Sequence, residues 1–393
     1  MPGTFIGAVM AAEQPLRLMV DATRQRVGGG IQVALAVIDS AARDPGIELC
    51  VASSRAVAAE LGSTDFPGHR VGDDLPTSWI VQQRALRRIE RDFAPDLVLT
   101  VFGPGRWRSK APNLQGFALG LMLDPDANRL GKSAMQQLKG KLADWAKIAL
   151  FRRNADFLLA EADHVVAGAG ELLGFPPEKQ FVVPNSYSPR FLDNVERSTV
   201  KSPSDGTIRF FVPGAGFAHK NLQVLPAIAE QLKALGHDVR FTLTLKDDES
   251  AWQELEADAD RRDIVAAFER VGRIPNEQMA DAYLAHDFAL CLSLCESSTA
   301  VIPEAFLAQR PLILADRPWA RGLAGDGALF VDPIDPEAAA QAIDGLINRP
   351  RDQEALVGAG RRRLEQCYPP PEKRWQLYRS VIFACAGKDD GGA

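Results

Sequence analysis

The 393-residue chain is long for one compact domain, so two domains of ordinary size are expected. Hydrophobic residues make up 46% and charged residues 24%, which is typical of globular proteins with a buried core. A formal net charge of −6 argues against a general nucleic-acid-binding protein, because such proteins present a basic face. The five cysteines are scattered without a Cys-x-x-Cys pair, which argues against a disulfide framework or a zinc site and fits the cytoplasm.

In the first half of the chain, short apolar runs alternate with amphipathic segments of helix length, the pattern of a parallel sheet covered by helices. The predicted strands are 16–22, 47–53, 96–102, 114–119, 164–167 and 181–184. The predicted helices are one that begins near Gly30, 78–93 and 132–154. No run approaches the roughly 18 uninterrupted apolar residues of a membrane-spanning helix, so any membrane contact is expected to be peripheral.

A polar stretch at 197–206, RSTVKSPSDG, is typical of a linker, and a second alternating series follows it. Its predicted strands are 208–213, 239–245, 288–294, 311–315 and 328–331, and its predicted helices are 222–235, 276–286, 299–308 and 336–347. We therefore predict an α/β protein with two Rossmann-like, doubly wound domains facing a cleft. The predicted ranges are 1–196, the linker 197–206, 207–366, a helical segment 367–387 that packs back on the first domain, and a disordered tail 388–393.

Two carboxylates stand eight residues apart where the predicted strand 288–294 ends and the next helix begins. Glu296 is expected at the strand end and Glu304 on the first turns of the helix, with the N–H groups of Ser298, Thr299 and Ala300 available to a diphosphate between them. The alternative is a loop glutamate followed by an ordinary first-turn glutamate. The spacing alone does not decide between these interpretations.

The residues around this pair carry a family resemblance. From Val271 the chain contains Gly-x-x-Pro, a strand followed by the E-x7-E pair, Ala-x-x-x-x-Pro before an apolar run, and Gly-Ala-Leu-Phe-Val-Asp-Pro. This order resembles the donor lobe of the GT-B glycosyltransferases, specifically the large retaining family 4. The resemblance covers about residues 207–365, whereas the first half of the chain matches only in outline.

The resemblance implies a role for each carboxylate. Glu296 corresponds to the family's first glutamate and is expected near the donor sugar. Glu304 corresponds to the second and is expected to accept hydrogen bonds from the ribose hydroxyls, which suits an acceptor-only group. The family usually has glycines after its first glutamate, whereas this chain has Ser297, Ser298 and Thr299 there.

A second element follows the strand 208–213. Gly214, Gly216, His219, Lys220 and Asn221 resemble the family's segment whose lysine contacts the donor diphosphate. The same glycines nearly match the dinucleotide motif G-x-G-x-x-G, which would indicate a dehydrogenase. The third glycine is missing, and no acidic residue ends the next strand at the expected distance, so the motif is a weak match.

The remaining candidates are less specific. Arg273 and Ile274 occupy the family position that meets the nucleobase. Gly28, Gly29 and Gly30 resemble the family's glycine-rich loop on the first lobe, or they form a simple tight turn. Asp124 is a candidate for an acceptor hydroxyl. It belongs to an Asp-x-Asp sequence, but metal binding by that motif belongs to a different glycosyltransferase fold, so no metal site and no cofactor are predicted.

The segment 131–154 contains six basic residues and one acid, with Trp145 and Phe151 among its apolar residues. Such a helix can lie on an anionic membrane surface, or it can be a covering helix with a solvated basic face.

The sequence therefore predicts a retaining glycosyltransferase that takes a nucleoside-diphosphate sugar to a saccharide or lipid-linked saccharide, without nucleic acid, in the cytoplasm or at the inner face of the membrane. Catalysis is assigned to Glu296 and Lys220. A sugar-nucleotide epimerase of the same fold, a non-catalytic nucleotide-binding protein and a dehydrogenase are the alternatives.

Overall fold

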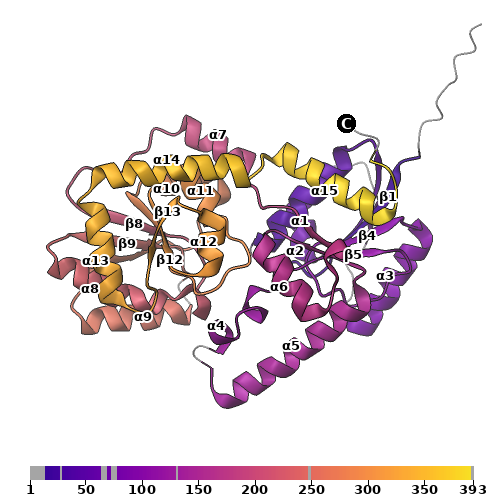
Figure 1. Ribbon diagram of the computed structural model, residues 1–393, viewed down its shortest axis with the longest axis horizontal. Coiled ribbons are helices and arrows are strands. Elements are labelled where there is room, and N and C mark those ends of the chain that lie inside the picture. The colour runs from indigo at the N-terminus through magenta and orange to yellow at the C-terminus, as the bar shows by residue number, and fades with distance from the viewer. Residues whose placement is uncertain are drawn as a thin grey trace, which may run out of the picture. The chain divides into compact units, whose positions relative to one another are not determined.

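The computed structural model describes residues 14–26, 29–62, 69–71, 78–129, 132–246 and 249–390. Figure 1 labels the elements of the first half. They are β1 (Leu16–Ala22), α1 (Gly29–Arg43), β2 (Ile47–Ser53), α2 (Arg55–Leu61), β3 (His69–Val71), α3 (Trp79–Phe93), β4 (Leu97–Thr100), β5 (Asn113–Gly116), α4 (Pro125–Arg129), α5 (Ala134–Asn154), β6 (Phe157–Ala160), α6 (Asp163–Leu173), β7 (Gln180–Val182) and α7 (Pro189–Arg197).

The elements of the second half are β8 (Ile208–Val212), α8 (Leu225–Ala234), β9 (Val239–Leu243), α9 (Ser250–Arg261), β10 (Phe268–Arg270), α10 (Met279–Leu284), β11 (Phe288–Cys291), α11 (Val301–Leu307), β12 (Leu312–Ala315), α12 (Pro318–Ala324), β13 (Ala328–Val331), α13 (Pro336–Ile347), α14 (Pro350–Cys367) and α15 (Pro371–Ala386). Short 3-10 helices connect several of them.

Two sheets organise these elements. In the described residues, one sheet has seven strands in the order β3-β2-β1-β4-β5-β6-β7 and the other has six in the order β10-β9-β8-β11-β12-β13. All pairs of the six-stranded sheet are parallel, as are the pairs that join β1 to β2 and β4. The predicted α/β class with two doubly wound, Rossmann-like sheets is confirmed.

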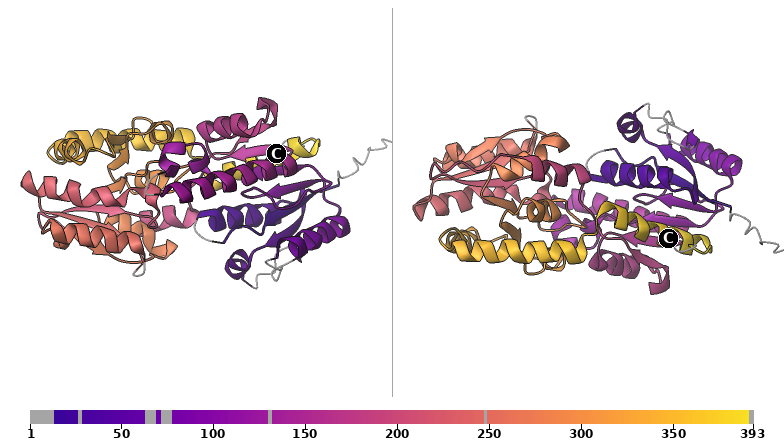
Figure 2. Two further views of the ribbon diagram at one scale, coloured as in Figure 1. Left: turned by 90° about the horizontal axis from the view of Figure 1, so that it is seen from below. Right: turned by 90° about the horizontal axis from the view of Figure 1, so that it is seen from above.

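The six-stranded sheet has helices on both faces, as Figure 2 shows. Phe210 and Phe211 on β8 point to opposite faces, as neighbours on a strand must. Phe210 packs in a core with residues of α8, α9 and α13, and stacks on Phe241 with ring centroids 4.7 Å apart. Phe211 packs in the other core, with residues of α10, α11 and α12. Burial on both faces explains the nearly continuous apolar strands.

One predicted strand is wrong. Residues 164–167 lie in α6, and the strand is β6, a few residues earlier. The buried residues of α6 are Val165, Val166, Ala169, Gly170 and Leu173. These positions recur with the helical period, so the apolar run that suggested a strand is one face of a helix.

By contacts, the chain divides into two compact units. One contains the described residues up to Gly116 with Lys147–Leu158 and the chain from Tyr378 onward, and the other contains Phe117–Ala146 and Leu159–Leu377. This division differs from the predicted ranges 1–196 and 207–366, which remain predictions. In the first unit, Arg379 of α15 forms an ion pair with Asp44 at 3.0 Å. Lys388, in the tail predicted to be disordered, pairs with Asp96 at 2.6 Å, while 391–393 lie outside the described residues.

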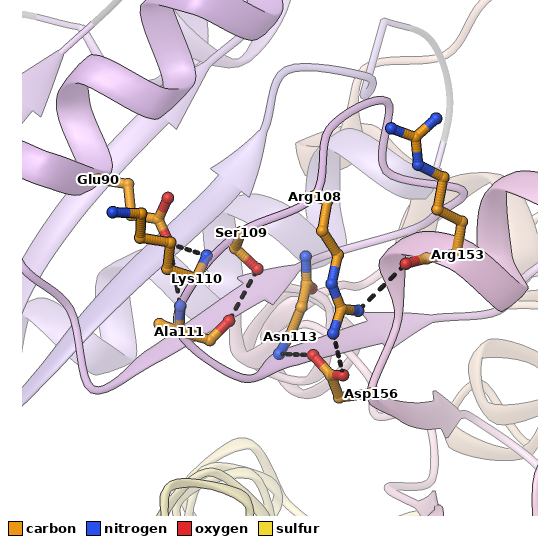
Figure 3. Close-up of polar contacts among 8 residues, drawn as sticks. All are labelled: Glu90, Arg108, Ser109, Lys110, Ala111, Asn113, Arg153 and Asp156. Atoms are coloured by element: carbon orange, nitrogen blue, oxygen red, sulfur yellow. Dashed lines mark hydrogen bonds and ion pairs between the residues drawn. The ribbon is translucent and has the colours of Figure 1, made fainter.

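The loop between β4 and β5 is fixed by side chains of its neighbours (Figure 3). The Glu90 carboxylate accepts hydrogen bonds from the backbone N–H groups of Lys110 and Ala111. Arg108 donates to Asp156 at 2.7 Å and to the Arg153 carbonyl at 3.2 Å, near the end of α5. The loop is therefore tied to both α3 and the last turn of α5, in keeping with a preference of cations for helix C-termini.

Candidate functional site

The strand order of the six-stranded sheet reverses between β8 and β11, and ligands of doubly wound sheets bind beyond the carboxyl ends of the strands at such a point. A pocket lies there. It is lined by Val212–Ala215 after β8, by Lys220 and Leu222, and by Leu290–Ser293 at the end of β11. The element predicted to meet a diphosphate therefore lines a pocket at the switch point.

Lys220 and Glu296 form the central pair of this site. The Lys220 Nζ atom donates to the Glu296 Oε1 atom at 2.6 Å, and only 16% and 11% of the two side chains are exposed. Burial lowers the pKa of the Lys220 ammonium, but the Glu296 charge outweighs burial and leaves that pKa raised. The structure thus brings together the two residues to which the sequence assigned catalysis, as a charged pair.

The backbone around Lys220 has special conformations that place its side chain. Asn221 has a φ of 57°, and its Nδ2 atom donates to the Pro333 carbonyl at 2.8 Å. Gly214 has a φ of 146°, a conformation that favours glycine, and the Lys220 side chain passes over it. Asn221 therefore serves as an anchor beside Lys220, with its amide engaged within the protein.

Two other predicted donor-binding residues are also engaged. The Gly216 N–H donates to the Glu249 Oε2 atom at 2.6 Å, and a Cβ atom at Gly216 would lie 2.5 Å from that oxygen. A carboxylate thus occupies the backbone donor that was predicted to face phosphate. The His219 ring stacks on Phe217 with centroids 5.7 Å apart, and burial lowers its pKa.

The loop between Glu296 and α11 is held by hydrogen bonds to other parts of the same unit. The Ser297 Oγ atom accepts from the Gly120 N–H at 2.7 Å, and a Cβ atom at Gly120 would lie 2.7 Å from that oxygen. Thr299 is buried and accepts from the Val301 N–H, while Ala300 is exposed at the helix N-cap. The helix begins at Val301, two residues later than predicted.

Ser298 belongs to a buried polar cluster that the sequence did not indicate. Its hydroxyl accepts from Asn185 Nδ2 at 3.1 Å and hydrogen bonds with Glu161. Glu161 forms an ion pair with Arg374 of α15 at 2.8 Å, with 12% and 9% of the side chains exposed. Burial raises the Glu161 pKa and Arg374 opposes that shift. These residues lie far apart in the sequence, so no local pattern could have linked them.

His164 is a further residue that sequence reasoning missed. It lies on the first turn of α6, and its ring hydrogen bonds with the Glu296 backbone. Burial lowers the His164 pKa. A histidine of the first lobe was sought only around 113–126, and the mistaken strand at 164–167 concealed this one. An imidazole beside the predicted donor sugar site can donate or accept a proton.

Glu304 lies on the first turn of α11, apart from the charged pair. Burial raises the pKa of its carboxyl from 4.5 to about 7, and the Tyr283 hydroxyl opposes this shift by interacting with the carboxyl. Tyr283 is fully buried in the core under α10 and α11. Near neutral pH the Glu304 carboxyl therefore exists in both protonation states, which matters for a group predicted to accept hydrogen bonds from ribose.

The remaining predicted residues are spread over the described structure. Arg273 is exposed, and Ile274 packs partly buried against the core of α10 and α11. Gly29 and Gly30 begin α1, while Gly28 lies outside the described residues. The Asp124 Oδ1 atom accepts from the Ala127 N–H at 2.9 Å and so caps α4.

The segment that contains Asp124 contacts the same loop as the charged pair. Leu121 and Ala127 pack with Leu294 and Cys295 in a small apolar cluster. Burial raises the pKa of the Cys295 thiol to about 12, and the Asp124 charge raises it further. Asp124 thus lies near the residues that precede Glu296.

Two searches of the described residues gave no candidates. No group of three or more His, Cys, Asp and Glu side chains there could hold a metal ion. Among the described helices, none has the length and apolar character needed to cross a bilayer.

A family model described as "Glycosyl transferases group 1" matches residues 195–363, which include Lys220, Glu296 and Glu304. No curated protein matches the chain. The match covers the part of the sequence in which the resemblance to GT-B glycosyltransferases was found.

Solved structures share the fold across nearly the whole chain. Sucrose-phosphate synthase from Thermosynechococcus elongatus is 17% identical with a TM-score of 0.69, over 94% of this chain and 100% of that one. HepE of Anabaena, in complex with UDP and glucose, is 14% identical with a TM-score of 0.67, over 94% and 100%. WaaG, a glycosyltransferase involved in lipopolysaccharide biosynthesis, is 16% identical with a TM-score of 0.66, over 93% and 99%.

Proposed function

We propose the reaction of this chain from the premise that it is a glycosyltransferase of the GT-B fold. It transfers a sugar from a nucleoside-diphosphate donor to a hydroxyl of a saccharide or lipid-linked saccharide, with retention of anomeric configuration. The product belongs to a cell-surface polysaccharide or glycolipid. HepE, which has the same fold, is known with UDP and glucose and supports this donor class.

The observation that carries this proposal is the Lys220–Glu296 pair at the switch point. Lys220 supplies a compact charge to the donor diphosphate, and stabilisation of the departing diphosphate is the main contribution to catalysis. Glu296, held by Lys220, orients the donor sugar through its hydroxyls. Glu304 accepts hydrogen bonds from the ribose hydroxyls when it is ionised. The reaction requires no cofactor besides the donor.

Thermal-shift measurements with nucleoside diphosphates and their sugars test the donor site. The chain is expected to be stabilised by one base class and, less strongly, in the Glu304→Ala variant. Stabilisation by none of the compounds would sink the proposal, and an unchanged response of Glu304→Ala would refute the ribose role. Donor turnover without any acceptor would instead favour an epimerase.

We also propose that α5 brings the enzyme to an anionic membrane surface. Met135, Leu138, Leu142 and Trp145 are 54–70% exposed, and their spacing of three or four residues places them on one face of the helix. Lys139 and Lys141 are exposed beside that stripe. The opposite face contains Phe151 and Asn154, which are buried. An apolar stripe flanked by lysines suits the boundary between headgroups and acyl chains.

Sedimentation with anionic vesicles tests this membrane contact. Leu142→Glu should reduce binding because it places a negative charge in the stripe, whereas Ala143→Glu, an exposed position off the stripe, makes the same charge change as a control. Binding should weaken as salt is added. No binding by the unmodified chain, or equal loss in both variants, would contradict the proposal.

A further inference from the structure

Two arginines follow neighbouring strands in the seven-stranded sheet. Its strand order reverses between β1 and β4, which pair in parallel with Asp21 opposite Thr100. Arg24 comes just after β1, and Arg106 lies in the loop after β4. Both residues therefore lie beyond the carboxyl ends of the two strands that flank the switch point, the usual place for a ligand in this kind of sheet.

The buried Asp21 carboxylate holds the two arginine-bearing segments together. Its Oδ1 atom accepts from the Thr23 N–H at 3.1 Å and from the Thr23 hydroxyl at 2.7 Å, and its Oδ2 atom accepts from Trp107 Nε1 at 2.9 Å. Thr23 directly precedes Arg24, and Trp107 directly follows Arg106. One carboxylate at the end of β1 thus fixes the backbone beside each arginine.

Further hydrogen bonds make both segments rigid. The Arg106 carbonyl accepts from Trp79 Nε1 at 2.8 Å and from Gln83 Nε2 at 2.5 Å, both on α3. The residues that follow, Arg108–Ala111, are the ones held in Figure 3. On the other segment, the Gln25 carbonyl accepts from the Ser54 hydroxyl. The two guanidinium groups therefore extend from fixed backbone, which lowers the entropy cost of binding a ligand.

The charges of this region are unbalanced. Burial lowers the pKa of the Arg24 guanidinium, and the like charge of Arg106 lowers it further, more than Asp21 and its negative charge compensate. Neither arginine forms an ion pair with a carboxylate in the described part of the chain. Asp21 instead satisfies its oxygens with neutral donors. Two half-buried guanidinium groups of like charge are costly to hold together unless an anion joins them.

We propose that Arg24 and Arg106 form a binding site for a phosphate-type oxyanion carried by the acceptor. Guanidinium groups present N–H pairs that match phosphate oxygens, so two of them can hold one phosphate from two sides. The assignment rests on the proposed glycosyltransferase function for the word acceptor, while the anion site itself stands on unit 1 alone. The phosphate belongs either to a saccharide phosphate or to the phosphate through which a saccharide is linked to a lipid.

Calorimetric titration of the full chain with inorganic phosphate and with a hexose phosphate tests the site, in the presence of a saturating nucleoside diphosphate. The double variant Arg24→Gln/Arg106→Gln should weaken binding at least about tenfold, because each charged hydrogen-bond donor contributes substantially. Arg87→Gln, an exposed arginine on α3, is the matched control and should bind like the unmodified chain. A circular dichroism melt confirms that each variant is folded.

Vesicles that contain phosphatidic acid form the second arm and distinguish the two sources. Loss of hexose phosphate binding in the double variant assigns a soluble phosphorylated acceptor, and loss of vesicle binding alone assigns a lipid-linked one. Equal binding by the double variant and the unmodified chain in both arms would overturn the inference. Competition between the nucleoside diphosphate and phosphate for these arginines would also overturn it, since the anion would then be the donor's. Failure of every nucleoside diphosphate to bind would count against the proposed function and leave the variant comparison valid.

Discussion

The two sheets have the same kind of switch point but opposite charge balance. Beyond β8 and β11, the cation Lys220 is paired with Glu296, and the nearby Gly216 N–H is bonded to Glu249. Beyond β1 and β4, the carboxylate of Asp21 is satisfied by neutral donors, and the two arginines are left without a carboxylate partner. Similar backbone topology therefore supports different binding tasks, which are decided by how each region balances its charges.

The largest expected effect is that of Lys220→Ala on turnover. Removing a charge that stabilises the leaving diphosphate should lower kcat by about 100- to 1,000-fold. The variant also leaves Glu296 without its cation, which misplaces the donor. Measured donor consumption checks the prediction, with the exposed Lys201→Ala as control. A loss below about threefold would show that the pair is structural.

Glu304 gives the switch point of the six-stranded sheet a pH dependence. Because its carboxyl pKa is raised from 4.5 to about 7, its contribution to the free energy of unfolding is greatest below pH 4.5 and is lost as pH rises to about 7. The loss is at most about 3 kcal/mol. Glu304→Gln should abolish this decline and be more stable than the unmodified chain at pH 8.

Urea unfolding at pH 5 and pH 8 measures the effect of Glu304. The exposed Glu254→Gln on α9 is the control and should retain the decline. Nucleoside diphosphate affinity should rise over the same pH range, because the ionised carboxyl is the hydrogen-bond acceptor for ribose. A pH profile shared by the Glu304→Gln variant would contradict both statements.

Two buried tryptophans compare the switch points by stability. Trp107 Nε1 donates to the Asp21 carboxylate at 2.9 Å, whereas Trp319 Nε1 donates to the Ser293 carbonyl at 3.2 Å. Each Trp→Phe change loses one hydrogen bond and some buried volume. Trp107→Phe should cost about 1 kcal/mol more than Trp319→Phe, because a buried charged acceptor is left with one donor fewer. Equal losses in urea unfolding would indicate that Asp21 does not depend on Trp107.

The sequence predicted most of the fold because apolar runs mark strands that are buried on both faces. It located β1, β2, β13 and α13 at their observed bounds. It mistook the start of α6 for a strand, since a helical face of Val165 and Val166 looks like an apolar run over a few residues. Short segments such as β6 carry too little periodicity to correct that error.

The site was predicted only where the chain is local. Lys220 and Glu296 follow strands that turned out to be neighbours, so strand-end reasoning brought them together. His164, Glu161 and Arg374 contact the Glu296–Thr299 loop from other parts of the chain, and no spacing in the sequence encodes those contacts. The arginines at the β1–β4 switch point were missed because their significance lies in the absence of partners, which only coordinates reveal.

A crossed titration tests the division of tasks between the two switch points most directly. UDP, or the nucleoside diphosphate that stabilises the chain most, and a hexose phosphate are each titrated into the Lys220→Ala variant and into the Arg24→Gln/Arg106→Gln variant. The account predicts that Lys220→Ala loses nucleotide affinity and retains hexose phosphate affinity, while the arginine variant shows the reverse. Loss of both ligands in both variants, or of neither, would contradict it.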